Sequence, residues 1–359
     1  MRTWSLPAHL AVLGLALTLT ACAPGAAPGG AAVPAGAPPT PPRAAAPAPA
    51  ASTPAALVPL DIAIISSAGY YLPAYLATDR GFLEQEGIKG EWVVAGTPES
   101  VRAVVSGSVG IGLLGSDPCI VAAHRGAPIR QVAGFLHKPT YDLVGAERYR
   151  TIADLRGQEI GVSSVASGTA VLARVFLEAN GLRRGEYDLV AAGGNAERIA
   201  ALQSGRLGAA VLSDPGNFVA FEQGYNHLGN IMTVIPEYDF SGWWVHLPWA
   251  EQHRDLLVRF LKAQIRARRW LDDPANREAV LAVLQERLRV SPSIAEKIYT
   301  FYTQETPDAL ARDLGFNERA TTKTIEILGE LGELQPPYPP AQQFYEPSYY
   351  QRALQELGR

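Results

Sequence analysis

Short polar residues gather at one point of the stretch "IGVSSVASGTAVLARVFLEANGL", residues 160–182. An apolar run ends in Ser163-Ser164, and Ser167-Gly168-Thr169 then precedes a helical pattern. Serines and glycines at such a turn suit three kinds of chemistry: a nucleophilic serine, a loop that cradles phosphate, or a loop whose hydroxyl groups hold a ligand without reacting. The surrounding sequence distinguishes these three.

The two catalytic interpretations lack essential partners. A nucleophile elbow has the pattern Gly-x-Ser-x-Gly, but Val165 stands where the second glycine is required. A nucleophilic serine also needs a positioned base, and no histidine has a spacing that nominates one. A Walker A loop needs a lysine after its last glycine, whereas Thr169 follows Gly168. We therefore expect a binding loop and no catalytic residue.

Other motifs also favour structure over chemistry. The run "GIGLLG" (110–115) fits Gly-x-Gly-x-x-Gly, but a dinucleotide fingerprint follows a strand and opens a helix, and here the order is reversed. We interpret it as a glycine-rich strand. Cys119 has apolar neighbours, which indicates a buried structural thiol. No His, Cys, Asp or Glu cluster has metal-ligand spacing, so we expect neither metal nor cofactor. The "RARR" run (266–269) is expected to be a solvated helix face.

The chain contains a long internal repeat. The segment "GFLEQEGI" (81–88) parallels "VFLEANGL" (175–182), and "ESVRAVVSGSVGIGLLGSDP" (99–118) parallels "ERIAALQSGRLGAAVLSDP" (197–215). The Ser66-Ser67 pair likewise parallels Ser163-Ser164. These pairs keep the same order at a period of roughly a hundred residues, which is too long for a solenoid and suits two similar lobes.

Each repeat predicts the same order of elements. A strand ends in Ser-Ser, a helix closes at a glycine, a second strand follows, a second helix begins near Thr97 or Asn195, and a third strand ends in Ser-Asp-Pro. Alternating strands and helices indicate mainly parallel sheets, whose ligands bind at the carboxyl ends of the strands. We therefore predict a two-lobed α/β fold with a cleft between facing polar loops.

Helical sequence dominates after the second repeat, with expected helices at 249–271, 274–288, 291–302 and 318–331. Because no third Ser-Ser unit follows, these helices are expected to return to the first lobe. The chain then crosses between the lobes twice, near Ala146 and Tyr238. The expected division is lobe 1 at 57–146, lobe 2 at 147–238, and a return to lobe 1 at 239–359.

Composition restricts the partners. The formal net charge of −4 gives no basic footprint for nucleic acid. Hydrophobic residues make up 47% of the chain, enough for sizeable cores, and two cysteines cannot form a disulfide framework.

The first residues resemble a bacterial lipoprotein signal. Arg2 supplies a positive charge, residues 10–19 form an apolar run too short to span a bilayer, and Leu19-Thr20-Ala21-Cys22 resembles a lipobox. We expect a signal peptide at 1–22, lipidation of Cys22, and a disordered Ala/Pro/Gly tether at 23–56. The folded body would then lie outside the cytoplasm on a lipid anchor. An ordinary signal peptide with an incidental cysteine is the alternative.

Longer segments resemble the nitrate/sulfonate/taurine-binding family of ABC-transporter solute-binding proteins. "YYLPAYLATDRGFLEQEGI" (70–88) is similar to that family's early "A…GFF…GL" segment, and "TIADLRGQEIGVSSVASGTAVLARVFLEANGL" (151–182) to its "DLKGKKIGV…GS…LL…LE…GL" segment. "TKTIEILGELGEL" (322–334) resembles its late helix. The family includes the pyrimidine-precursor-binding branch of thiamine uptake.

The resemblance implies a type 2 periplasmic-binding fold that closes on its ligand. It implies a monomer that binds a small solute, either anionic, such as sulfonate or nitrate, or heteroaromatic, and delivers it to a separate permease and ATPase. Two alternatives remain: a tethered sensor that presents solute to a receptor, and a pyrimidine-precursor synthase of the same fold. The yeast-type synthases carry a cysteine-rich motif, whereas the expected folded body has Cys119 alone.

By the same resemblance, the polar loops at the strand ends bind the solute, and aromatic residues supply flat walls. A helix cap that touches no ligand is the alternative for each serine, and core packing is the alternative for Tyr71 and Trp243. The expected ligand-binding residues are Ser66, Ser67, Tyr70, Tyr71, Thr97, Ser116, Asp117, Ser163, Ser164, Ser167, Gly168, Thr169, Asn195, Ser213, Asp214 and Trp243.

Overall fold

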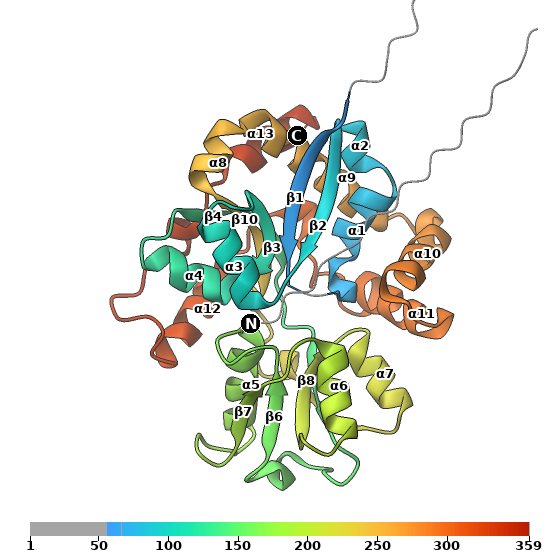
Figure 1. The fold of residues 1–359 in the computed structure, drawn as a ribbon, viewed down its shortest axis with the longest axis vertical. Coiled ribbons are helices and arrows are strands. Elements are labelled where there is room, and N and C mark those ends of the chain that lie inside the picture. The colour runs from blue at the N-terminus through green and yellow to red at the C-terminus, as the bar shows by residue number, and fades with distance from the viewer. Residues whose placement is uncertain (1–55, 66, 359) are drawn as a thin grey trace, which may run out of the picture. The chain divides into compact units, whose positions relative to one another are not determined.

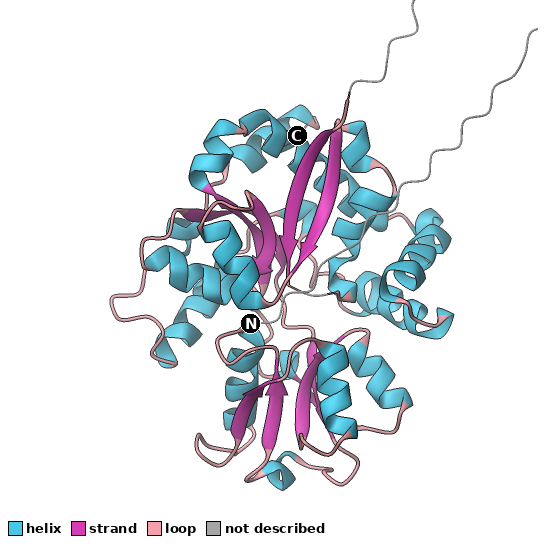
Figure 2. Ribbon diagram, viewed as in Figure 1, coloured by secondary structure: helices cyan, strands magenta, loops and turns pink. Residues whose placement is uncertain are grey.

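The computed structural model describes residues 56–65 and 67–358. The expected signal peptide, the lipidation site Cys22, nearly all of the expected tether and Ser66 lie outside these residues. The described part contains two five-stranded sheets, each flanked by helices (Figures 1 and 2).

The first sheet has the strand order β2-β1-β3-β10-β4. β1 pairs in parallel with β2 and β3, and β10 pairs antiparallel with β3 and β4. Four strands therefore run in one direction and β10 runs in the other. Its strands are β1 (Val58–Ile64), β2 (Ile88–Val94), β3 (Ile111–Gly115), β4 (Ile129–Leu136) and β10 (Ser241–His246).

The second sheet repeats this arrangement in the order β7-β6-β8-β5-β9. β6 pairs in parallel with β7 and β8, and β5 pairs antiparallel with β8 and β9. Its strands are β5 (Tyr141–Gly145), β6 (Glu159–Val162), β7 (Asp188–Ala191), β8 (Ala209–Ser213) and β9 (Asn226–Asn230).

The two sheets have equivalent topologies, which confirms the predicted two-lobed α/β class. The sequence repeat maps β1, β2 and β3 onto β6, β7 and β8. The fourth strand of each sheet is the one that the chain enters directly after leaving the other sheet, and it is the reversed one. Mainly parallel sheets were the sequence expectation; the sheets are mixed, because each crossing strand arrives from the opposite end.

The first crossing lies earlier than the sequence predicts. A boundary at Ala146 would leave Tyr141–Gly145 in lobe 1, but this segment is β5 and pairs with β8 and β9. The crossing therefore precedes Tyr141. The chain returns between β9 and β10, because β10 joins the first sheet. We propose that lobe 2 comprises β5–β9 with α5–α7, and that lobe 1 comprises the first sheet with the remaining helices.

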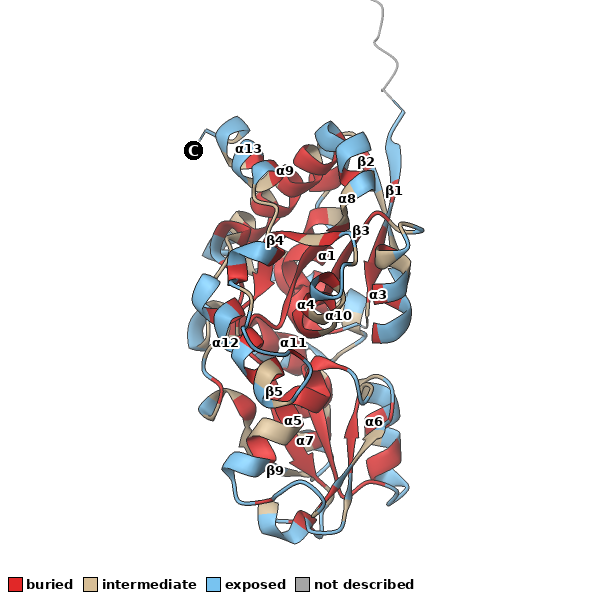
Figure 3. Cartoon of the chain, turned by 90° about the vertical axis from the view of Figure 1, so that its left-hand side faces the viewer, coloured by how far each residue is buried: buried red, intermediate tan, exposed pale blue. Residues whose placement is uncertain are grey.

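The central strands are buried on both faces. All five residues of β3, "IGLLG", and all five of β8, "AAVLS", are buried, as continuous apolar runs are when helices cover both faces of a sheet. Figure 3 shows the buried strands of both sheets enclosed by helices. The glycine-rich run at 110–115 is thus strand β3, as predicted, and α4 begins directly after it.

The helices fit the predicted repeat and the helical C-terminal part. Helix α9 packs against α1, α2 and α13, so the C-terminal helices cover the first sheet. The expected helix at 249–271 is divided at His253 into α8 and α9. The helices are α1 (Leu72–Asp79), α2 (Phe82–Gln85), α3 (Thr97–Val105), α4 (Ser116–His124), α5 (Gly168–Ala179), α6 (Asn195–Gln203), α7 (Gly216–Glu222), α8 (Leu247–Gln252), α9 (Arg254–Leu271), α10 (Arg277–Leu288), α11 (Pro292–Thr300), α12 (Glu318–Glu330) and α13 (Ser348–Glu356).

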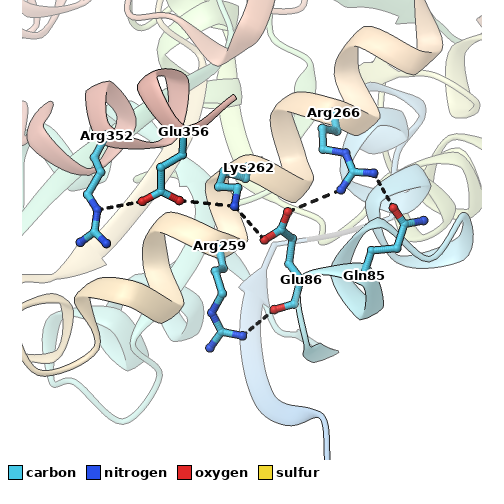
Figure 4. Close-up of polar contacts among 7 residues, drawn as sticks. All are labelled: Gln85, Glu86, Arg259, Lys262, Arg266, Arg352 and Glu356. Carbon is cyan, nitrogen blue, oxygen red and sulfur yellow. Dashed lines mark hydrogen bonds and ion pairs between the residues drawn. The ribbon is translucent and has the colours of Figure 1, made fainter. Parts of the chain in front are cut away.

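An ion network fixes α9 between α2 and α13 (Figure 4). Glu86, next to α2, accepts from Lys262 at 3.2 Å and from Arg266 at 3.5 Å. Lys262 also lies 3.4 Å from Glu356 of α13, which pairs with Arg352. The predicted solvated face at 266–269 is therefore wrong, because Arg266, Arg268 and Arg269 pair with Glu86, Asp272 and Asp313 of the same chain.

Replacing Glu86 by glutamine is expected to lower the free energy of unfolding by about 1–2 kcal/mol, because it removes a charge-assisted contact from Lys262 in a mostly buried setting. The Glu86 side chain is 11% exposed. Arg352→Gln, which changes a half-exposed member of the same network, should leave the urea midpoint unchanged. Equal midpoint shifts for both variants would contradict the expectation that the buried member of the network contributes more to stability than the exposed one.

Candidate ligand-binding site

A cavity of ≈ 100 Å³ lies where the carboxyl ends of the two sheets face each other. Equivalent strands contribute equivalent positions to it, so the cavity follows the repeat. Lobe 1 supplies Ile65 after β1, Gly96 and Thr97 after β2, and Gly115 at the end of β3; lobe 2 supplies Ser163 after β6, Gly193 and Gly194 after β7, and Ser213 at the end of β8. The other lining residues are Tyr70, Tyr141, Ser167, Gly168, Thr169, Arg198 and Phe240.

Three hydroxyl groups of the loop before α5 form a closed triangle. The Oγ of Ser163 lies 2.8 Å from the Oγ of Ser167 and 2.9 Å from Oγ1 of Thr169, and the last two atoms are 2.8 Å apart. The backbone N–H of Ser163 also donates to Thr169 Oγ1 at 2.9 Å. The triangle fixes the loop at the start of α5, where the first N–H groups of the helix have no intrahelical acceptor and carry partial positive charge.

Replacing Thr169 by valine keeps the side-chain volume and removes the hydroxyl that joins the triangle. We expect solute affinity to fall about tenfold, since the Ser163 N–H and two hydroxyls each lose a partner and the loop loosens. Thr322→Val, on the exposed face of α12, is the matched control and should bind normally. Calorimetric titration with the best ligand of the screen described below measures both, and unchanged affinity for Thr169→Val would remove the triangle from the site.

Arg198 is the one arginine on the cavity wall. It lies in the first turn of α6 and is 4% exposed. It donates to the carbonyl oxygens of Gly194 and Val211 and to Oδ1 of Asn195. All three acceptors are neutral. The neighbouring carboxylate of Glu197 attracts the guanidinium, but no described carboxylate lies within ion-pair distance of it. Burial lowers the pKa of Arg198 from its ordinary value, which still leaves an arginine cationic at neutral pH.

Aromatic side chains form another part of the wall. The rings of Tyr141 and Phe240 have centroids 4.9 Å apart, and Tyr70 meets Phe240 edge-on at 6.2 Å. Tyr141 begins β5 directly after the first crossing, and Phe240 lies directly before β10 on the second. Both crossings therefore supply a ring to the cavity, and these rings give it a flat apolar side.

Sequence reasoning missed Arg198, Tyr141 and Phe240. Arg198 occupies the repeat position of Ser100, which is buried in lobe 1 and donates to the carbonyl oxygens of Ile64 and Ala95. A polar residue at the same place in both repeats was the available signal. Tyr141 and Phe240 lie outside the repeated segments, so the repeat could not predict that they line the cavity.

Seven of the expected ligand-binding residues do line the cavity, and eight further described ones lie elsewhere. Trp243 and Tyr71 are in the core, where Trp243 packs against Phe135 and Phe260 at 5.9 and 4.8 Å. The structure therefore favours the core-packing alternative for both. Those on the cavity wall are Tyr70, Thr97, Ser163, Ser167, Gly168, Thr169 and Ser213.

The remaining polar residues support the walls or lie beside them. From their residue types, Thr97 and Asn195 are both good N-cap candidates, but Gly96 and Gly194 occupy the N-cap positions of α3 and α6. The amide of Asn195 donates instead to the carbonyl oxygen of Ser213 at 3.0 Å. Ser67 is exposed and lines a neighbouring groove of ≈ 690 Å³. Ser116 is buried at the start of α4, and Ser164 is half-buried in its loop.

Asp117 and Asp214 are buried next to the cavity and do not line it. Burial raises the pKa of each carboxyl group to about 7. Asp214 accepts from the backbone N–H of Gly69 at 3.0 Å, and Asp117 accepts from the hydroxyl of Tyr238. Both residues therefore bond to groups of the protein itself.

Within the part of the chain that the structure describes, no three His, Cys, Asp or Glu side chains are grouped so that they could hold a metal ion. The helices of that part include none with the length and apolar character needed to cross a membrane.

Two similar α/β lobes, two crossings and a cavity at the facing strand ends define the two-lobed fold of the periplasmic-binding-protein type. The chain belongs to the NMT1/THI5-like family, whose sequence model matches residues 68–275, more than half of the chain. This confirms the resemblance inferred from the segments at 70–88 and 151–182.

Solved structures of the same fold include two solute-binding proteins. The alkanesulfonate-binding protein SsuA of Xanthomonas axonopodis pv. citri, bound to MOPS, is 18% identical with a TM-score of 0.67, over 82% of this chain and 100% of SsuA. The periplasmic nitrate-binding protein NrtA of Synechocystis PCC 6803 is 13% identical with a TM-score of 0.70, over 84% of this chain and 89% of NrtA.

A curated relative is an enzyme. The 4-amino-5-hydroxymethyl-2-methylpyrimidine phosphate synthase of Schizosaccharomyces pombe is 32% identical over 95 residues. The match covers 26% of this chain and 28% of the synthase, so it spans little more than a quarter of either protein.

Proposed function

We propose that the protein is the solute-binding component of an ABC importer and that its solute is a small anion. The observation that carries this proposal is Arg198, a buried guanidinium on the cavity wall that forms no ion pair with a carboxylate of the described residues. Burying a charge without an opposite charge is unfavourable. An anion in the cavity would supply that opposite charge.

The free donors of Arg198 suit an oxyanion. A guanidinium has five N–H donors, and the three bonds to protein acceptors use one from each nitrogen. One donor therefore remains on each terminal nitrogen, and charge-assisted donors of this kind bind carboxylate, sulfonate or phosphate oxygens. The first turns of α5 and α6 add partial positive charge at the same cavity.

The aromatic wall favours an anion with a flat or apolar part. Tyr70, Tyr141 and Phe240 provide this surface, so a heteroaromatic acid fits the same cavity as a sulfonate. That SsuA binds alkanesulfonates and NrtA binds nitrate, by their names, supports an anionic ligand class.

A thermal-shift screen of alkanesulfonates, nitrate, aromatic carboxylates and pyrimidines tests this proposal. A ligand at a hundredfold excess over its Kd stabilises by about 2.7 kcal/mol, so a binder raises the melting temperature clearly. Neutral pyrimidines serve as the uncharged control set. If only neutral compounds stabilise the protein, the anion assignment fails; if none does, the solute-binding proposal fails for these classes.

The transport role includes a lipid anchor and membrane partners. We infer that Cys22 is lipidated, that the monomer stays at the outer side of a bacterial membrane, and that separate permease and ATPase subunits receive the solute. Cys22→Ser is expected to release the protein from membranes into the soluble fraction. Continued sedimentation of the variant with membranes would contradict the anchor.

We infer a binding protein rather than a synthase. Cys119 is the one cysteine of the described residues; it is fully buried, and burial raises the pKa of its thiol well above the ordinary value. A protonated, inaccessible thiol is inert, so the cavity lacks the cysteine chemistry expected of the synthase relatives. Turnover of a pyrimidine precursor by the purified protein would reverse this inference.

A further inference from the structure

Each lobe places one buried carboxyl group against a glycine of the other lobe. The carboxyl groups belong to Asp117 and Asp214, the aspartates of the two repeated Ser-Asp-Pro turns. The glycines, Gly69 and Gly168, each follow the Ser-Ser loop of their repeat and begin the next helical segment. The same pair of elements therefore meets twice, once in each direction across the lobes.

We propose that Asp117 and Asp214 are positioning residues that set how closely the lobes approach, so that they control access to the solute site without touching the solute. This inference rests on the proposed solute-binding function. The two contacts are called the clasps below: clasp 1 is Asp117 with Gly168, and clasp 2 is Asp214 with Gly69.

Clasp 2 combines a hydrogen bond with a steric stop. The N–H of Gly69 donates to Asp214 Oδ1 at 3.0 Å. A Cβ on Gly69 would lie 2.7 Å from Asp214 Oδ2 and 2.8 Å from a methyl group of Ile298. Ile298 belongs to lobe 1 like Gly69, so the contact across the lobes is the one with Asp214: a side chain at position 69 requires either the Asp214 carboxyl group or the opposite lobe to move.

Clasp 1 repeats the steric stop at the solute cavity. A Cβ on Gly168 would lie 2.6 Å from Asp117 Oδ2 and 3.0 Å from the ring of Phe240. Real Cβ atoms essentially never come this close to an oxygen, so a residue with a side chain fits here only if the Asp117 carboxyl group turns away, the lobes separate, or Asp117 is shortened. Gly168 itself lines the cavity, whereas Asp117 lies behind it.

Both carboxyl groups are also tied to the crossings between the lobes. The hydroxyl of Tyr238, on the second crossing, donates to Asp117. Tyr302 bonds to Asp214 and also lies 3.1 Å from Oγ1 of Thr140, directly before β5 on the first crossing. Each clasp therefore joins a loop of the opposite lobe to one of the two segments that must bend when the lobes move.

The two clasps satisfy only part of the hydrogen-bonding capacity of their carboxyl groups. In each carboxyl group one oxygen is bonded, while Oδ2 is buried without a partner. An unpartnered buried oxygen opposes closure, because it would be hydrated when the lobes separate. The open and closed states therefore differ little in free energy, and a solute that binds the closed state better shifts the equilibrium towards closure.

The experiment measures the distance between the lobes directly. Spin labels are attached at Arg102→Cys on α3 and Gln203→Cys on α6, two exposed positions, in the full chain carrying Cys22→Ser. Pulsed electron resonance then compares the parent with Asp117→Ala, Gly168→Ala and the double variant. Circular dichroism confirms that each variant is folded; alanine is a better helix former than glycine at position 168.

We expect a short-distance population in the parent and in Asp117→Ala, its loss in Gly168→Ala, and its return in Asp117→Ala/Gly168→Ala. Rescue by shortening Asp117 is the diagnostic result, because a methyl group that merely disturbed the helix or the solute would not be relieved by a change in the other lobe. A parent without the short population, its persistence in Gly168→Ala, or failure of the rescue would each overturn the clasps.

This readout needs no added solute, so its failure is separate from failure of the proposed function. A protein that binds no anion can still show the rescue. Conversely, a protein that binds anions with equal affinity in the parent and in Gly168→Ala retains its function and loses the clasp.

Discussion

Replacing Arg198 by methionine is expected to weaken binding of the anionic solute at least about 100-fold. The change keeps an unbranched side chain of similar length and removes the charge. Losing one partner of a buried, hydrogen-bonded charge pair costs about 2–5 kcal/mol, and about 1.4 kcal/mol corresponds to a factor of ten. Calorimetric titration with the best ligand from the screen measures the change.

The controls separate charge from packing. Arg206→Met, at an exposed position of the same lobe, should bind normally. Arg198→Lys restores the positive charge but not the paired N–H donors, so we expect intermediate affinity. Because Arg198 also bonds to the carbonyl oxygens of Gly194 and Val211, the melting temperature of every variant is recorded alongside. Affinity within about threefold of the parent for Arg198→Met would refute the anion site.

The sequence predicts the framework of the site because the framework is duplicated. Polar loops after equivalent strands appear twice in the chain, and parallel strands bring their carboxyl ends to one edge. Ser163, Thr169 and Ser213 could therefore be placed in the cleft from sequence order alone, and the structure places them on the cavity wall. Thr97 follows from the same argument applied to the first repeat.

The charge and the rings of the site do not follow from the repeat. Arg198 replaces a serine at the equivalent position of lobe 1, so the feature that we propose selects the solute is the one in which the two lobes differ. Tyr141 and Phe240 belong to the crossings, where each sheet receives a strand from the other lobe. That exchange also explains why the sequence places the first crossing too late. The strand β5 directly follows β4 in the sequence, so it was assigned to lobe 1 although it pairs within lobe 2.

Aromatic residues on one strand show the opposite error. Trp243 lies on β10, directly after a crossing, and an amphipathic ring near a cleft suggests ligand contact. Burial decides otherwise: Trp243 pairs opposite Leu113 and Ala133 and is fully buried, and Trp244, whose side chain lies on the other face of the sheet, is fully buried as well. Helices cover both faces of this central strand, and that burial was not available from sequence.

Trp243→Ala is accordingly expected to lower the free energy of unfolding by about 3–5 kcal/mol, the range for truncating a large buried aromatic side chain. The indole is fully buried between Phe135 and Phe260, one of which belongs to β4 and the other to α9. Alanine would leave a cavity between α9 and the first sheet, and the packing contacts that the indole makes there would be lost. Urea unfolding followed by circular dichroism measures the loss.

Trp243→Phe separates the core role from a ligand role. The indole N–H has no hydrogen-bond partner in the described structure, so phenylalanine removes a buried unsatisfied donor along with part of the ring, and the destabilisation should be smaller, about 1–2 kcal/mol. Solute affinity should be unchanged, because Trp243 does not line the cavity. If Trp243→Phe instead keeps its stability and loses solute affinity, the ring contacts solute and its assignment to the core is wrong. The pair of variants therefore tests whether the cavity ends at Tyr70, Tyr141 and Phe240 or extends into lobe 1.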